Sequence, residues 1–314
     1  MTDTDINALI DDLRTGKPVS NAALRNADLR QKDLRGIRLR GYRLHGTRFD
    51  GADLSRTTWQ TCELDQVIFD RATLTESAFI SCHGQTVSWH HALARRSWMK
   101  QCTWRDSDFA QADLTRLAAV DTQFLTCHWQ SAILLQTWLS YCDLSGQDLA
   151  DVVWTQSHFP NSRLRAADLA NATLNQCSFN HADANEANFS HVQAVSCTFH
   201  GASLIGVAFD GARLDRANFD QSRLDQARFA QASLQAARFV GALSPDVTFA
   251  HSDLTYADLS HLQAAHADFS GANLRGAKLH AVQLPDARWD KALLEQVRRD
   301  DAELRVAECW QPPV

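Results

Sequence analysis

Large apolar side chains recur along this chain with a strict period of five. All fifteen phenylalanines stand at residue numbers ending in 4 or 9, and leucine or tryptophan fills most of the other positions of that series. Between Leu24 and Trp289 the series has 54 members, of which 47 are Leu, Phe, Trp or Met. The exceptions are Gly84, Ala94, Ala119, Ala184, Ala194, Ser244 and Ala264. A repeat this regular predicts a solenoid.

A small residue usually lies two positions before the large one, often with Asp or Asn between them, as in Ala27-Asp28-Leu29 and Ala272-Asn273-Leu274. A period of five matches neither the 3.6 of a helix nor the 2 of a flat strand. The pattern therefore indicates a chain that turns a corner every five residues and directs two side chains of each five inward.

This A-(D/N)-L/F pattern resembles that of the pentapeptide-repeat family, over about residues 20 to 290. The resemblance implies an all-β solenoid, a right-handed quadrilateral β-helix with four pentapeptides per coil. The 20-residue spacing of Cys62, Cys82 and Cys102 independently supports that coil length. The repeats would then form about 13 coils, on the order of 65 Å long at one strand spacing per coil.

The expected organisation has three parts: an N-terminal helical cap at 1–20, the β-helix at 21–290, and a C-terminal helical cap or dimerisation segment at 291–314. Ile6, Leu9, Ile10 and Leu13 follow helical spacing, so we expect a helix over 4–15. The fivefold phase is lost after Trp289, and we expect a second helix from there to about 307.

Composition points to a soluble, cytoplasmic chain. The N-terminus lacks the basic and apolar regions of a signal peptide, and no apolar run is long enough to span a membrane. Seven of the eight cysteines occupy the small inward position, where a free thiol packs as a small hydrophobe, and the exception is Cys309.

Catalytic, cofactor and metal sites are not expected. The thirteen histidines are scattered and show no ligand cluster, and nucleophile and phosphate-loop motifs are missing. Carboxylates are numerous because the repeat itself uses Asp, so pairs of them carry no acid–base inference. We therefore predict that the protein is not an enzyme.

The outward positions of the middle coils are unusually apolar. Arranging the residue numbers in coils of 20 predicts exposed apolar columns over about residues 78–155. The candidate interface consists of Ile80, Leu93, Trp98, Val120, Ile133, Leu135, Trp138, Tyr141 and Val153. Exposed apolar groups of this kind favour a protein interface. The alternative is a repacked core, in which Trp98 or Trp138 turns inward to fill the space beside small residues such as Gly84.

Charge is also patterned, although the net charge is only −6. Arg25, Arg30, Arg35 and Arg40 occupy equivalent positions on four successive faces and form a candidate basic collar. An acidic ring of Asp210, Asp215, Asp220 and Asp225 lies near the other end. Both rings are interpreted either as self-paired solvated surface or as contacts for a charged partner.

The preferred function is a non-enzymatic scaffold that binds a protein partner of unknown identity. The regular alternation from Phe199 to Phe239 is similar to bacterial members associated with secretion-effector handling. The alternative that the family resemblance implies is a DNA mimic that binds and protects DNA gyrase, for which a broadly acidic surface is expected. A homodimer is compatible with the C-terminal segment, whereas membrane or direct nucleic-acid binding is not expected.

Overall fold

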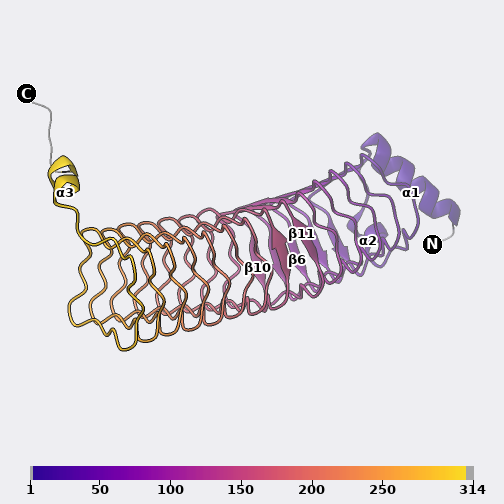
Figure 1. Cartoon of the computed structure of the whole chain (residues 1–314). Coiled ribbons are helices and arrows are strands. Elements are labelled where there is room, and N and C mark those ends of the chain that lie inside the picture. The colour runs from indigo at the N-terminus through magenta and orange to yellow at the C-terminus, as the bar shows by residue number, and fades with distance from the viewer. Residues whose placement is uncertain (1–2, 309–314) are drawn as a thin grey trace, which may run out of the picture. The chain divides into compact units, whose positions relative to one another are not determined.

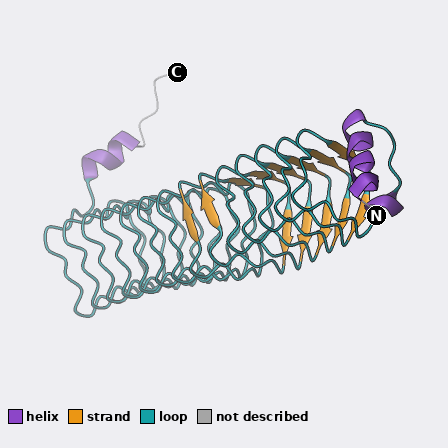
Figure 2. Cartoon of the chain, turned by 90° about the vertical axis from the view of Figure 1, so that its right-hand side faces the viewer, coloured by secondary structure: helices purple, strands orange, loops and turns teal. Residues whose placement is uncertain are grey.

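The computed structural model describes residues 3–308, and the chain divides into two compact units, Met1–Thr173 and Leu174–Val314. Both units consist of stacked coils of chain (Figure 1). Named strands lie only in the first unit, whereas the described part of the second unit is built from isolated parallel bridges (Figure 2).

Two helices begin the first unit, α1 (Asp3–Thr15) and α2 (Asn21–Leu24). The predicted N-terminal helix is therefore confirmed. Its apolar face is buried, and Leu13 lies among the inward leucines of the first coil, such as Leu24 and Leu39. The helix thus covers apolar side chains at the start of the solenoid.

The strands of the first unit are three residues each. They are β1 (Arg38–Arg40), β2 (Arg43–His45), β3 (Thr58–Gln60), β4 (Glu63–Asp65), β5 (Ala78–Ile80), β6 (His83–Gln85), β7 (Trp98–Lys100), β8 (Thr103–Arg105), β9 (Ala118–Val120), β10 (Gln123–Leu125), β11 (Ile133–Leu135), β12 (Trp138–Ser140) and β13 (Val153–Thr155). They form parallel sheets in the orders β1-β3-β5-β7-β9-β12, β10-β8-β6-β4-β2 and β11-β13.

The register confirms a coil of 20 residues. Leu39 pairs with Trp59, and Trp59 pairs with Phe79, so each residue lies beside the one 20 positions later. Residues with numbers ending in 1 or 6 take left-handed φ angles, such as 50° at Thr61, which makes four corners per coil. The chain is therefore the predicted parallel, four-sided β-helix.

Left-handed corners are costly for side chains other than glycine, at about 1–2 kcal/mol each. Many of these residues have a compensating hydrogen bond, such as that from the Thr61 N–H to the Ile80 carbonyl oxygen of the next coil (2.9 Å). The ladder of bonds between coils thus stabilises the corners and aligns residues 20 positions apart in columns.

Stacked aromatic rings fill the core of the second unit. Phe199 and Phe219 lie parallel with ring centroids 4.9 Å apart, and Phe209 meets Phe219 edge-on at 5.6 Å. Both arrangements are favourable for aromatic pairs. The inward phenylalanines are fully buried, which explains why this position rarely tolerates a polar residue.

The C-terminal expectation is partly wrong. The coil continues beyond Trp289, because Leu293 bridges to Asn273 and Arg298 bridges to Lys278. Helix α3 spans only Ala302–Glu308. Leu294 and Val297 lie within the range expected for the longer helix and instead continue the fivefold series.

The inward cysteines are small core residues, as expected. Seven thiols are free and buried among the described residues. Burial raises the pKa of Cys127 to about 12 and that of Cys142 to about 12, so both remain protonated near neutral pH. Cys309, the remaining cysteine, lies outside the described residues.

Candidate interaction surface

Two strands of the first unit direct tryptophans away from the core. The middle residue of each three-residue strand points inward, so its neighbours point outward; Met99 of β7 and Leu139 of β12 are buried. Trp98 is 39% exposed and Trp138 is 47% exposed. The alternative that these two tryptophans fill the core is therefore wrong.

The space beside Gly84 is filled by Trp104, a residue of the same inward series, rather than by an outward tryptophan. A Cβ atom built on Gly84 would lie 2.5 Å from Cζ3 of Trp104, a fully buried residue of the next coil. Gly84 thus accommodates a large neighbour within the same inward column, and no outward side chain is needed to fill the gap.

The outward column on this sheet alternates small and large residues. Ala78 pairs with Trp98, Trp98 with Ala118, and Ala118 with Trp138. Two strand spacings, roughly 9–10 Å, therefore separate the backbones that carry the two indoles. Half-buried Ala118 lies between them in the register, so a small side chain separates the two tryptophans along the column.

The second column of the same sheet is less accessible. Ile80 and Val120 are half-buried, Lys100 lies between them in the register, and Ser140 is buried. The apolar character of this face therefore comes mainly from Trp98 and Trp138.

The neighbouring face carries a second apolar strip. Ile133 and Leu135 of β11 are exposed beside Val153 of β13, and Ile133 pairs directly with Val153. Leu93 is also exposed, but Asp113 lies between it and Ile133 in the bridge register. The second strip therefore consists of Ile133, Leu135 and Val153, with Leu93 set apart.

Asp113 is itself largely buried. Its carboxylate accepts hydrogen bonds from Nε of Arg95 (2.5 Å) and from the Thr115 N–H (3.0 Å). Although desolvation opposes ionisation, these hydrogen bonds hold the pKa of Asp113 below its ordinary value. The aspartate is thus a paired structural anion that interrupts the apolar row.

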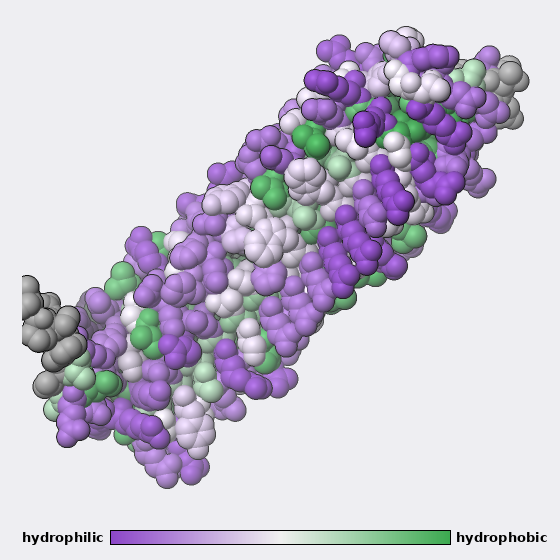
Figure 3. Space-filling model, turned by 90° about the horizontal axis from the view of Figure 1, so that it is seen from above, coloured by the Kyte–Doolittle hydropathy of each residue, from purple (hydrophilic) through white to green (hydrophobic). Residues whose placement is uncertain are grey.

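A polar corner separates the two apolar strips. Nε of Arg116 donates to Oε1 of Gln136 (2.9 Å), and Nε2 of Gln136 donates to Oε1 of Gln156 (3.0 Å). Tyr141 lies at the next corner with its side chain exposed. Figure 3 shows one face of the molecule, which is mostly purple and hydrophilic, with green and pale residues scattered over it.

The basic collar is partly neutralised by its own aspartates. Arg30 contacts Asp28 through two hydrogen bonds of 2.7 and 2.6 Å, and Arg35 contacts Asp33 in the same way. The hydrogen bond from Arg30 lowers the pKa of Asp28 to about 2. Arg25 and Arg40 are exposed and form no ion pair within residues 3–308. Two of the four collar arginines therefore carry a positive charge that no carboxylate of the described residues neutralises.

The acidic ring of the second unit is also largely paired. Asp210 contacts Arg228 at 2.8 Å, and Asp220 contacts Arg238 at the same distance. Asp225 contacts Arg223 at 3.3 Å. This supports the interpretation of the ring as solvated, self-paired surface.

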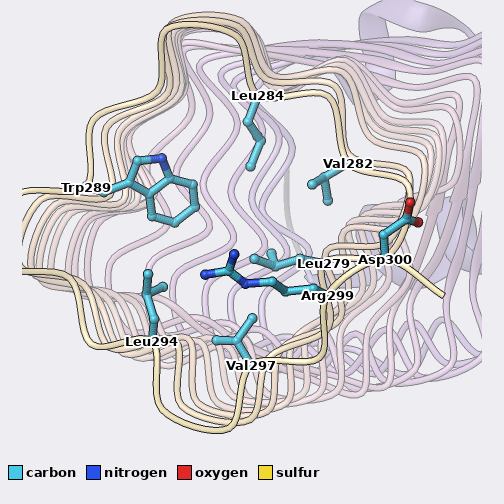
Figure 4. Close-up of a pocket in the computed structure, with 8 residues that line it drawn as sticks. All are labelled: Leu279, Val282, Leu284, Trp289, Leu294, Val297, Arg299 and Asp300. Carbon is cyan, nitrogen blue, oxygen red and sulfur yellow. The ribbon is translucent and has the colours of Figure 1, made fainter.

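The last coil of the second unit is open at its end. Side chains of Leu279, Val282, Leu284, Leu294 and Val297 line a cavity of about 450 Å³, which the Arg299 guanidinium enters (Figure 4). Leu304 of α3 is 45% exposed, and all the α3 side chains that the structure describes are exposed. The expectation that a C-terminal helix forms a lid over the apolar end is therefore wrong for α3.

One grouping was missed in the sequence. The histidines were expected to form no ligand cluster, yet the second unit brings His261, His280 and Glu308 together. His261 and His280 are one coil apart, a separation that short motif spacings do not reveal. Within residues 3–308, none of the helices is long and apolar enough to cross a membrane.

Comparison with known proteins agrees with the fold. The family model described as pentapeptide repeats matches in 8 copies, over residues 20–56, 138–176, 162–201, 212–243 and 246–295. No curated protein matches the sequence.

Solved structures give only distant similarities. HetL, a pentapeptide repeat protein involved in heterocyst differentiation regulation from the cyanobacterium Nostoc sp. Strain PCC 7120, is 19% identical over 89% of this chain and 94% of its own, with a TM-score of 0.21. Full-length QnrB1, a plasmid-mediated fluoroquinolone resistance protein, is 18% identical over 72% of this chain and 97% of its own, with a TM-score of 0.26. Similarities this low support no conclusion about the activity of this chain.

Proposed function

The chain belongs to the pentapeptide repeat family, and from this premise we propose that it is a non-enzymatic scaffold that binds a protein partner through the first unit. The observation that carries the proposal is the pair of exposed tryptophans, Trp98 and Trp138, on either side of half-buried Ala118 in one sheet. The strip formed by Ile133, Leu135 and Val153 lies on the neighbouring face and extends the contact surface.

Physical arguments favour a protein as the occupant of this surface. Tryptophan and tyrosine are enriched among the residues that dominate protein interfaces. Backbone hydrogen bonds already hold the strands that carry these side chains, so binding has to order side-chain rotamers but no backbone. A partner with large apolar side chains opposite Ala78 and Ala118 would complement the alternation of small and large residues.

We assign this scaffold to the cytoplasm of a bacterium and, more specifically, to the handling of secretion effectors. Buried free thiols such as Cys127 suit a reducing compartment. The regular core from Phe199 to Phe239 underlies the comparison with effector-handling members of the family. Self-association through the same apolar strips is the competing use of this surface.

A pair of substitutions tests the proposal. Trp98→Asp/Trp138→Asp should keep the circular dichroism spectrum of the wild type, because both side chains lie outside the core. The matched control is Gln123→Asp, at an exposed outward position of β10 on another sheet. Partner capture from a bacterial lysate should be lost in the double variant, retained in the control, and insensitive to high salt.

Sedimentation equilibrium of the same proteins separates the two uses. A wild-type dimer that becomes a monomer in the double variant would identify the strips as a self-association surface. The proposal would be contradicted if capture survives both tryptophan substitutions but is lost in high salt or with Arg25→Ala/Arg40→Ala. That result would identify the basic collar as the binding surface. Purified DNA gyrase is included as bait, since binding independent of the tryptophans would support the DNA-mimic alternative.

A further inference from the structure

Two histidines and a glutamate converge at the C-terminal part of the second unit. His261 lies at a left-handed corner, with φ of 60°, and His280 comes from the following coil. Glu308 lies on α3. Nε2 of His261 is 3.0 Å from one oxygen of Glu308, and Nε2 of His280 is 3.4 Å from the other.

This geometry fits a metal ion in size and donor type. One ligand atom from each of the three residues lies within 4.8 Å of the other two. A tetrahedral zinc ion bound at about 2.0–2.1 Å holds its ligand atoms roughly 3.3–3.5 Å apart. Two imidazoles and one carboxylate are also a ligand set that zinc uses when a fourth position stays open.

His280 is the most telling member of the group, because it is only 5% exposed. Its ring meets that of His261 edge-on, with centroids 5.4 Å apart. Its other nitrogen, Nδ1, lies 3.2 Å from the carboxylate of Asp300 and 3.1 Å from the backbone N–H of Asp301. A buried imidazole with carboxylates at both nitrogens matches the arrangement of a metal ligand supported by an outer carboxylate.

Asp300 is held in place for that supporting role. Nε of Arg305 donates to its carboxylate at 2.8 Å. In the tautomer that binds metal through Nε2, the proton resides on Nδ1 and is donated to Asp300. Without metal, the Asp301 N–H favours the opposite tautomer, in which Nε2–H donates to Glu308. Metal binding therefore exchanges one hydrogen-bond pattern of His280 for another.

We propose that His261, His280 and Glu308 bind a divalent transition metal ion of the zinc class. Two nitrogen donors and one oxygen donor suit Zn²⁺ or Co²⁺ and do not suit Mg²⁺ or Ca²⁺, which prefer oxygen. The ion joins two successive coils to α3 and leaves a fourth position for water or for a side chain of a partner. This proposal is independent of the apolar strips in the first unit.

The test is a titration of tag-free, full-length protein with Co²⁺, followed by its visible absorption, and then displacement of Co²⁺ by Zn²⁺. Wild type should bind one equivalent with the strong bands of a tetrahedral site. Glu308→Gln should weaken binding without unfolding the protein, because this side chain is exposed. Asp300→Asn should raise the dissociation constant about 10- to 100-fold, as expected for an outer carboxylate.

The control is His266→Ala. His266 is an exposed histidine of the same unit, with Asp246 at 3.1 Å and Asp286 at 3.8 Å, but no second histidine is grouped with it among the described residues. Its loss should leave the affinity unchanged. The proposal is overturned if wild type does not bind, if Glu308→Gln binds as wild type does, or if Cys309→Ser alone abolishes the site.

Discussion

Replacing Gly84 by leucine should destabilise the protein, although leucine is the residue that the repeat favours at this position. A Cβ atom at Gly84 would contact Cε3 of Trp104, lie 2.5 Å from its Cζ3, and lie 2.9 Å from Cγ2 of Val87. Trp104 is fully buried, so it has no room to retreat. The added side chain therefore overfills a column that is already closed.

The expected loss follows from two opposing terms. Overpacking of a closed core costs about 3 kcal/mol. Removing a glycine from a strand recovers about 1 kcal/mol of conformational entropy. The net loss of about 2 kcal/mol in the free energy of unfolding lowers the melting temperature of a 314-residue chain by roughly 3 °C.

Thermal unfolding followed by circular dichroism measures this shift. Midpoints are compared, because long repeat arrays can depart from two-state behaviour. The matched control is Gln85→Leu, which places the same side chain at the next, exposed position and should change stability by less than about 0.5 kcal/mol.

A double-mutant cycle isolates the contact. Trp104→Leu alone leaves a cavity, whereas Gly84→Leu/Trp104→Leu fills it and restores the usual repeat at both positions. The double variant should therefore be more stable than the sum of the single changes by about 0.5–3 kcal/mol. A melting temperature for Gly84→Leu at or above that of wild type, or strict additivity, would refute the packing argument.

Two further predictions concern the core. The indole N–H of Trp59 donates to Oγ1 of Thr57 (2.9 Å), whereas that of Trp89 has no acceptor among the described residues. Trp59→Phe should therefore lower the free energy of unfolding by about 1–3 kcal/mol more than Trp89→Phe does. Equal urea midpoints for the two variants would contradict this prediction. Burial raises the pKa of Cys127 to about 12, so this thiol stays protonated and unreactive at pH 8. In a Cys309→Ser background, the protein should therefore react with a thiol reagent at pH 8 only when it unfolds. Rapid labelling of the native protein would show instead that the inward thiols are accessible.

The fold was predictable because the same pair of small and large inward residues recurs along the repeats. The small and large inward residues define the pentapeptide, and the 20-residue spacing of Cys62, Cys82 and Cys102 indicates the coil that the register later confirms. The outward position of Trp98 followed from the same numbering, and its exposure is observed. Whether these exposed residues form an interface stays a prediction.

The errors arose where the repeat information is weak. At the C-terminus, Leu293, Leu294 and Val297 satisfy a helical spacing, and Leu294 and Val297 also fit the fivefold one. Only hydrogen bonds to the preceding coil decide between the two. At Gly84 the sequence shows a gap, but it does not show which large neighbour fills it. The His261–His280–Glu308 group joins two coils to a helix, so no local spacing could reveal it.

The separation of inward and outward positions also bears on function. Inward residues are required by the stack, so their identity reports the fold alone. Outward residues are under no such requirement, and at Asp210 and Asp220 of the second unit they are polar groups that pair with arginines. Trp98 and Trp138 differ from this pattern of polar outward residues, and they do not fill space in the core. Since the core does not need them, we expect these tryptophans to contact another surface, and the capture experiment with Trp98→Asp/Trp138→Asp tests this expectation.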